Sequence, residues 1–382
     1  MEAKFKHFDL KLLEPAFGSK LTDLIIELDY LRKKKLGGTT HPRIFFQLKE
    51  IFHILESIGS ARIEGNRTTI AEYIEAKLHD ENTTDEKIRE IRNMEKAMDF
   101  IDENIRHYPI NRMLVSELHK MVVAGLRPER EGDTAPGEYR VQNVRIAGSG
   151  HLPPDYTQVP QYMNELFEFI QKDAPAKYDL LKTALTHHRF VWIHPFRNGN
   201  GRTVRLFTYA MLVKQGFNID VGRIVNPTAV FCNDRQKYYD FLGQADSAEE
   251  AGLLNWCGYV LGGLKEEIQK IDRLLDYDYL SKTILLPAIE FSLERKVITD
   301  IEGKILKIAV GKQVFHASHI RSIMPGKIPA EISRILRRLR EKKMIISAKE
   351  SSRKYLMSFH NNYLLRGIIK ALGENGFLPI KD

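Results

Sequence analysis

The sequence is poor in cysteine and has no long apolar run. Only two of its 382 residues are cysteines, Cys232 and Cys257, and these neither build a disulfide framework nor have the paired spacing of metal ligands. No segment approaches the roughly 18 uninterrupted apolar residues of a membrane-spanning helix, and the N-terminal MEAKFKHFDLKLLEP contains no apolar signal core. We therefore expect a protein of the reducing cytoplasm, without membrane insertion or secretion.

Charge is distributed unevenly along the chain. The whole sequence has a net charge of +8, but the segment from Gly311 to Ser358 alone contains twelve Lys and Arg residues against three Glu, which leaves the rest close to neutral. With 43% hydrophobic residues, the chain has enough apolar material for two or three domains. The basic block predicts that one of them is a separate module with an anionic partner.

Apolar spacing predicts a mostly α fold. Helical periodicity runs from Ser19 to about Leu126, and resumes from Tyr162 to about Leu275. Between these stretches, GEYRVQNVRIAGSGHLPP predicts a β-hairpin flap at 139–151. We expect four parts, namely an N-terminal helical region at 1–105, a helical core at 106–275, a helical connector at 276–310 and a small α+β domain at 311–382.

The string HPFRNGNGRTVR combines a predicted anion cradle with a titratable base. Two glycines flank Asn200 between two predicted helices, an arrangement in which backbone N–H groups converge at a helix N-terminus. Arg202 and Arg205 share one face of the first turn, where their charges oppose the helix dipole unless a polyphosphate offsets both. His194 precedes the cradle and, with an ordinary pKa of about 6.5, can accept a proton at neutral pH.

This string resembles the Fic family signature, His-x-Phe-x-(Asp or Glu)-Gly-Asn-Gly-Arg-x-x-Arg, at seven of its eight specified positions. The resemblance extends over about 60–250, through GEYRVQNVRI upstream and NDRQKYYDFL downstream. It implies an all-helical core that transfers AMP from ATP to a hydroxyl of a target protein and releases pyrophosphate. It also implies site roles: His194 as general base, Phe196 as loop anchor, Gly199, Asn200 and Gly201 as the cradle of the α- and β-phosphates, Arg202 on the β-phosphate and Arg205 on the γ-phosphate.

Asn198 departs from this signature, because the family has an Asp or Glu there that holds Mg²⁺. An amide oxygen can still bind a hard cation, but as a neutral ligand it binds more weakly. We expect Mg²⁺ or Mn²⁺ to be weakly held at Asn198. A slow enzyme, a different group donor and a pseudoenzyme stay open as alternatives.

The segment SARIEG places Ser60 and Glu64 four residues apart, on one face of a predicted helix at about 45–65. By itself this is an ordinary polar pair near a helix end. It resembles the Fic inhibitory motif, (Ser/Thr)-x-x-x-Glu-(Gly/Asn), in which the glutamate pairs with the second signature arginine. The resemblance therefore implies that Glu64 pairs with Arg205 and competes with the γ-phosphate of ATP.

Two further expectations concern substrates. The flap at 139–151 is expected to dock an extended segment of the target protein by main-chain pairing, as in the family. Tyr239 and Asp246 resemble family positions that contact the base or ribose, although an aromatic residue at helical spacing also suits a core.

The basic end module resembles a winged helix domain. A short helix at 318–324, a Pro-Gly turn and a second helix entered at Pro329 are followed by two strand-like runs around a polar tip, AKESSRK. The second helix would read duplex DNA, with an acidic protein as the alternative partner.

Three functions follow from these features. The first is an autoinhibited protein adenylyltransferase that modifies a Ser, Thr or Tyr hydroxyl of a target protein or of itself. The second is a DNA-binding regulator that senses nucleotide without transferring it. The third is a deAMPylase in which Glu64 orients a water molecule. A homodimer stays open.

Overall fold

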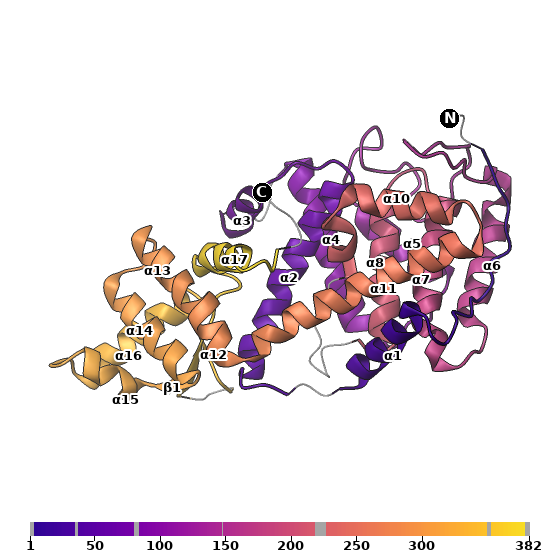
Figure 1. Cartoon of the computed structure of the whole chain (residues 1–382). Helices are drawn as coiled ribbons and strands as arrows, with labels where there is room; N and C mark the ends of the chain where they lie inside the picture. The colour runs from indigo at the N-terminus through magenta and orange to yellow at the C-terminus, as the bar shows by residue number, and fades with distance from the viewer. Residues whose placement is uncertain are drawn as a thin grey trace. The chain divides into compact units, whose positions relative to one another are not determined.

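The computed structural model describes residues 4–34, 37–79, 84–146, 148–217, 227–349 and 353–378. The chain is mostly helical, as predicted, and divides into two compact units (Figure 1). One unit comprises Met1–Leu36, Glu56–Thr68 and Thr84–Ile268, and the other comprises Gly37–Leu55, Thr69–Thr83 and Gln269–Asp382. Within the described ranges, no helix is long and apolar enough to cross a membrane.

The first unit is a helical assembly around two buried helices, α7 and α8. Helix α7 is buried on nearly all sides, as is α8, which identifies them as the core of the assembly rather than as surface helices. Helices α4 and α5 pack on α8, and α6 packs on α7. The helices of this unit are α1 (Lys20–Lys33), the part of α2 (Pro42–Ile63) from Glu56 onward, α4 (Glu86–Asn104), α5 (Arg112–Val123), α6 (Val159–Gln171), α7 (Asp179–Ile193), α8 (Asn200–Lys214), α9 (Pro227–Cys232), α10 (Arg235–Ala245) and α11 (Glu250–Asp272) as far as Ile268.

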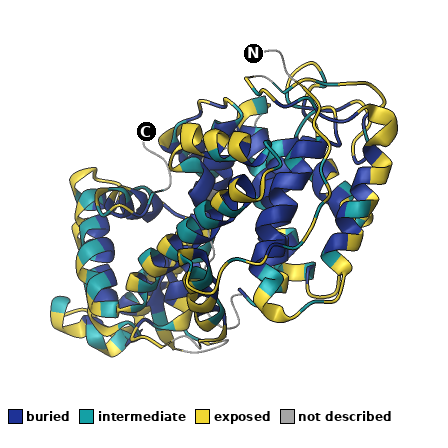
Figure 2. Ribbon diagram, turned by 45° about the vertical axis from the view of Figure 1, so that its right-hand side comes forward, coloured by how far each residue is buried: buried dark blue, intermediate teal, exposed yellow. Residues whose placement is uncertain are grey.

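Side-chain caps fix where these helices begin. Ser19 caps α1, Asp85 caps α4 and Asn111 caps α5, each by accepting a hydrogen bond from a backbone N–H of the first turn. Buried residues lie on the inward faces of the helices and exposed ones on outer faces and loops (Figure 2).

The second unit combines helices with a small antiparallel sheet of strand order β1-β3-β2. Helix α16 begins at Pro329, as predicted, because proline suits the first helical turn. Residues 350–352 of the predicted polar tip lie outside the described residues. This unit includes the part of α2 up to Leu55, the end of α11 from Gln269, α3 (Ile70–His79), α12 (Tyr277–Leu280), a π-helical turn (Ser281–Leu285), α13 (Leu286–Glu294), α14 (Asp300–Lys312), β1 (Phe315–His316), α15 (Ala317–Ile320), α16 (Pro329–Glu341), β2 (Ile345–Ser347), β3 (Lys354–Met357) and α17 (Leu364–Glu374).

The β-hairpin predicted at 139–151 is not formed by the described residues of that segment. Its one bridge joins His151 to Lys4, at a distant point of the chain. The backbone is instead tied to neighbouring loops, since the Arg140 N–H donates to Pro195 O at 2.8 Å. Residue 147, inside the predicted turn, lies outside the described residues.

Candidate functional site

The loop between α7 and α8 contains two residues with left-handed backbone conformations. His194 has φ 52° and Gly199 has φ 71°. A Cβ atom on Gly199 would come within 3.3 Å of both Val122 and Val123, so glycine is needed there for its conformation and for its size.

The side chain of Asn200 closes this loop rather than facing a ligand. Its Oδ1 accepts a hydrogen bond from the Phe196 N–H at 2.9 Å, and its Nδ2 donates to the Phe196 carbonyl at 2.8 Å. The predicted phosphate contact of Asn200 is thereby limited to its backbone N–H group.

Phe196 anchors the loop in the core, as predicted, with a partner that the sequence did not reveal. Its ring is fully buried and stacks on His119, with ring centroids 3.8 Å apart. His119 accepts a hydrogen bond from the Gly137 N–H at Nδ1, so its Nε2–H donates to the Asn198 carbonyl at 3.1 Å. Burial lowers the pKa of His119 to about 4, which keeps it neutral.

Arg140 holds the backbone of His194 in place. Its Nε donates to the His194 carbonyl at 2.9 Å, and its Nη2 donates to the Pro154 carbonyl at 2.6 Å. The guanidinium therefore connects the loop with the segment that follows the predicted flap. Sequence reasoning missed this residue because an arginine in a loop carries no signal of burial.

The imidazole of His194 is neutral and has the hydrogen-bonding pattern of a base. Its Nδ1 lies 3.3 Å from the Val191 carbonyl, so Nδ1 carries the proton and Nε2 keeps a free lone pair. Desolvation lowers the pKa of His194 to about 4. The imidazole is thus unprotonated at neutral pH and can accept a proton at Nε2.

Arg205 is bound to both residues of the predicted inhibitory pair. Its Nε donates to Ser60 Oγ at 2.8 Å, and its Nη2 donates to the Ser60 carbonyl at 3.0 Å and to Glu64 Oε1 at 2.6 Å. Burial opposes ionisation of Glu64, but the charges of Arg205 and Arg202 and the hydrogen bond from Arg205 together outweigh it and hold the pKa of that carboxyl below its ordinary value. The predicted ion pair between Glu64 and Arg205 is present.

The Glu64 carboxylate also covers the N-terminus of α8. A Cβ atom on Gly201, the second residue of that helix, would lie 2.1 Å from Glu64 Oε1. Helix N-termini attract anions through their free N–H groups and dipole. A carboxylate of the chain therefore occupies the anion-attracting end of α8.

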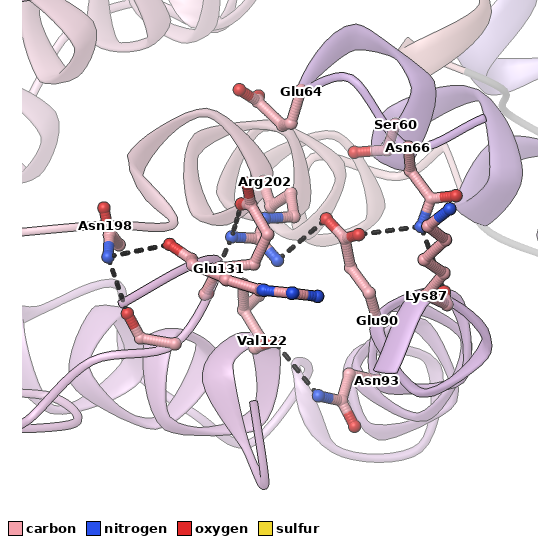
Figure 3. Close-up of polar contacts among 12 residues, drawn as sticks. Ser60, Glu64, Asn66, Lys87, Glu90, Asn93, Val122, Glu131, Asn198 and Arg202 are labelled. Carbon is pink, nitrogen blue, oxygen red and sulfur yellow. Dashed lines mark hydrogen bonds and ion pairs between the residues drawn. The ribbon is translucent and has the colours of Figure 1, made fainter. Parts of the chain in front are cut away.

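Arg202, fully buried, lies between two further carboxylates (Figure 3). Its Nη1 is 2.9 Å from Glu90 Oε1, and its Nη2 is 2.7 Å from Glu131 Oε2. Burial raises the pKa of Glu90, whose other oxygen accepts a hydrogen bond from Asn66 Nδ2 at 2.8 Å. Sequence reasoning missed Glu90 and Glu131, because each lies far from the signature in sequence.

Asn198 uses its amide nitrogen for the preceding loop. Nδ2 donates to the carbonyl oxygens of Gly132 at 2.7 Å, Arg130 at 3.2 Å and Pro128 at 3.4 Å. Among the residues that the structure describes, no donor reaches Oδ1, which leaves that neutral oxygen as the atom able to bind a divalent cation. A single neutral oxygen is a weak ligand for a hard cation, and weak metal binding at Asn198 stays a prediction.

The two residues expected near the base or ribose are in different environments. Asp246 accepts a hydrogen bond from His188 Nε2 at 2.9 Å, and its side chain is 19% exposed. Tyr239 is exposed on α10, where its ring lies against Tyr238 and near the Arg235 guanidinium. Within the described ranges, neither side chain forms a hydrogen bond or an ion pair with the loop 194–201.

The part of the chain that contains this loop is similar to known proteins. Residues 109–212 match the model of the Fic/DOC family. A protein adenylyltransferase Fic from Nematostella vectensis is 26% identical over 196 residues, covering 50% of this chain and 42% of that protein. One from Drosophila willistoni is 29% identical over 202 residues, covering 52% of this chain and 37% of that protein. The chain thus spans about two fifths of the length of these curated relatives.

Solved structures share the fold. A Fic family protein from Desulfovibrio desulfuricans superposes with a TM-score of 0.54 at 18% identity, covering 92% of this chain and 98% of that chain. A signaling protein with a Fic domain from Bacteroides thetaiotaomicron gives 0.52 at 19% identity, covering 67% and 97%.

Proposed function

We propose, from the premise that residues 109–212 form a Fic/DOC family domain, that this chain is an autoinhibited protein adenylyltransferase. It would transfer AMP from ATP to a Ser, Thr or Tyr hydroxyl of a target protein or of itself. One observation carries the proposal: the N-terminus of α8 and both of its arginines are occupied by carboxylates of the chain, beside a neutral histidine. Anion-binding groups that are filled internally are what an inhibited polyphosphate site requires.

In the reaction, His194 would act as general base. Its free Nε2 takes the proton of the target hydroxyl, and the hydroxyl oxygen attacks the α-phosphorus of ATP. The bond from that phosphorus to the bridging oxygen breaks, and pyrophosphate leaves. The left-handed backbone of His194, held by Arg140, fixes where the imidazole sits, and such positioning supplies much of the catalysis in phosphorus chemistry.

The cradle would bind the triphosphate. The backbone N–H groups of Gly199, Asn200 and Gly201 take the α- and β-phosphates, Arg202 takes the β-phosphate and Arg205 the γ-phosphate. A bound Mg²⁺, held through Asn198 Oδ1, would neutralise phosphate charge.

Inhibition would follow from the position of Glu64. Its carboxylate pairs with Arg205 and covers Gly201, so the γ-phosphate has no free guanidinium and the remaining phosphates cannot settle in line. Ser60 and Glu64 are both in the same unit as Arg205, which supports intramolecular inhibition. The segment 139–151 is the proposed docking site of the target protein, with Tyr239 and Asp246 proposed to contact the nucleoside.

Intact-mass measurement tests this function. We compare the wild-type chain, Glu64→Gly and Glu64→Gly/His194→Ala after incubation with ATP and Mg²⁺ or Mn²⁺. The proposal expects the mass of one AMP group to appear on the Glu64→Gly protein and not on the double variant. An unmodified Glu64→Gly protein, with added target extract also unmodified, would count against transferase activity.

DNA binding is the second candidate, and the surface of α16 favours it. Arg334, Arg337 and Arg338 are exposed on that helix, opposite the buried Ile332, Leu336 and Leu339. We propose that residues 311–382 form a winged helix domain with α16 as the reading helix, supported by its helices and three-stranded sheet. Binding to duplex DNA that weakens steeply with salt is the expected result, whereas no binding at low salt would contradict it.

A further inference from the structure

Glu131 binds Arg202 through its backbone as well as its side chain. Arg202 Nη2 donates to the Glu131 carbonyl at 2.9 Å and to Glu131 Oε2 at 2.7 Å. Because both acceptors belong to one residue, this contact depends on the position of the 128–132 backbone and not on a side-chain rotamer alone.

Asn198 holds that backbone on both sides of Glu131. Its Nδ2 donates to the carbonyls of Arg130 and Gly132, the two neighbours of Glu131 in sequence. The turn is tight, since a Cβ atom on Gly132 would lie 2.1 Å from the Leu126 carbonyl oxygen. An Asp or Glu at position 198 would have no N–H to donate and would face these carbonyls with a negative charge.

The two carboxylates on Arg202 differ in how readily a ligand can displace them. The Glu90 side chain is 5% exposed, whereas that of Glu131 is 41% exposed. A partly exposed ion pair contributes little to stability and exchanges easily with a competing anion. Glu90 is therefore the permanent counter-ion of the buried guanidinium, and Glu131 is the replaceable one.

We propose that Asn198 is a positioning residue that holds the 128–132 loop so that Glu131 occupies Arg202 and competes with the β-phosphate of a nucleotide. The inference rests on the proposed function, which assigns the β-phosphate to Arg202. The site would then have two separate blocks: Glu64 on Arg205 against the γ-phosphate, and Glu131 on Arg202 against the β-phosphate. Glu131 would act only against nucleotides that have a β-phosphate, whereas Glu64, which also covers Gly201, would act against every phosphate in the cradle.

Nucleotides of different length distinguish the two blocks. Glu64 covers Gly201 and therefore opposes all three nucleotides at the cradle, whereas Glu131 opposes only ADP and ATP, which have a β-phosphate. Calorimetry on the full chain without divalent metal gives the Kd of each nucleotide for the wild type, Glu131→Gln and Glu64→Gly. Glu129→Gln is the matched control, because Glu129 is exposed in the same loop and has no polar contact with either arginine among the described residues.

Glu131→Gln is expected to tighten ADP binding by about three- to tenfold, the range of a partly exposed charge-assisted contact. AMP affinity and the Glu129→Gln control stay at wild-type values. Glu64→Gly tightens the binding of all three nucleotides, and that of ATP most, because ATP also gains the freed Arg205. Equal changes for AMP and ADP, or no change for ADP in a protein whose ATP affinity rises in Glu64→Gly, would overturn the role of Glu131.

Asn198→Ala tests the positioning role. Releasing the loop is expected to tighten ADP binding as Glu131→Gln does, with no further gain when the two substitutions are combined. Damage to the cradle would instead weaken the binding of all three nucleotides, which would refute the role of Asn198. Should no nucleotide bind to any variant, including Glu64→Gly, the proposed function itself fails, and this inference fails with it.

Discussion

Removing the Glu64 carboxylate is expected to destabilise the protein and at the same time to make it responsive to ATP. In Glu64→Ala, the buried Arg205 guanidinium loses this carboxylate and keeps its contacts with Ser60. Removing one partner of a buried ion pair lowers the free energy of unfolding by about 3–5 kcal/mol. Because the Glu64 side chain is 27% exposed, water screens part of the uncompensated Arg205 charge. We therefore expect the free energy of unfolding to fall by about 2 kcal/mol.

That loss corresponds to a melting temperature lower by about 4–8 °C, since about 1 kcal/mol shifts a domain of 150–250 residues by about 2–4 °C. ATP should reverse it, because the γ-phosphate supplies the anion that Arg205 has lost. A ligand at a concentration of about 100 times its Kd raises the free energy of unfolding by about 2.7 kcal/mol. Thermal melts with and without ATP measure both effects, and Glu129→Ala is the control for the loss of one negative charge.

The reasoning would be refuted if Glu64→Ala melted at the wild-type temperature and gained no more from ATP than the wild type does. A Glu64→Ala variant that is destabilised but gains no stability from ATP would support the structural role of the ion pair and contradict phosphate binding by Arg205. Glu64 would then be a structural partner of Arg205, and Arg205 would not be a phosphate ligand.

Three further predictions concern His194, the buried histidines and Arg140. The transfer rate of Glu64→Gly should stay level from pH 8 to pH 6 and fall only toward pH 4, because desolvation lowers the pKa of His194 to about 4; a midpoint near pH 6.5 would contradict this. The free energy of unfolding should fall as pH drops from 6.5 toward 4, because His119 becomes protonated in the unfolded chain over this range but stays neutral in the folded one. Equal melting temperatures at pH 7.5 and 5.5 would contradict this. Arg140→Lys, which cannot reproduce the guanidinium fork, should lower kcat in the Glu64→Gly background about tenfold or more with ATP affinity unchanged; a parallel loss of affinity would show damage to the cradle instead.

Sequence reasoning predicted the parts of the site that are local. The loop between α7 and α8, the burial of Phe196 and the start of α16 at Pro329 follow from glycine, aromatic and proline positions that act over a few residues. The pair of Glu64 and Arg205 is far apart in sequence, and its prediction came from a family motif rather than from periodicity.

The parts that sequence reasoning missed depend on tertiary contacts. Glu90 lies on a helix with ordinary polar spacing, and Glu131 lies in a loop of mixed charges, so neither signals its contact with Arg202. The hairpin was predicted from β-branched residues, but in the described residues no strand ladder forms: Arg140 N–H donates to Pro195 O, and Gly150 O accepts from Lys4 N–H. The segments 37–55 and 69–83 group with the C-terminal unit, which no local pattern indicates.

The most direct test of the central claim compares ATP labelled at the α-phosphorus with ATP labelled at the γ-phosphorus. Each is incubated with Glu64→Gly and with Glu64→Gly/His194→Ala, and the label that remains on the protein is counted after denaturation. Adenylyl transfer by His194 predicts that the α-label is retained in the first variant only and that the γ-label is retained in neither. Retention of the γ-label, or an α-label that persists without His194, would contradict the account.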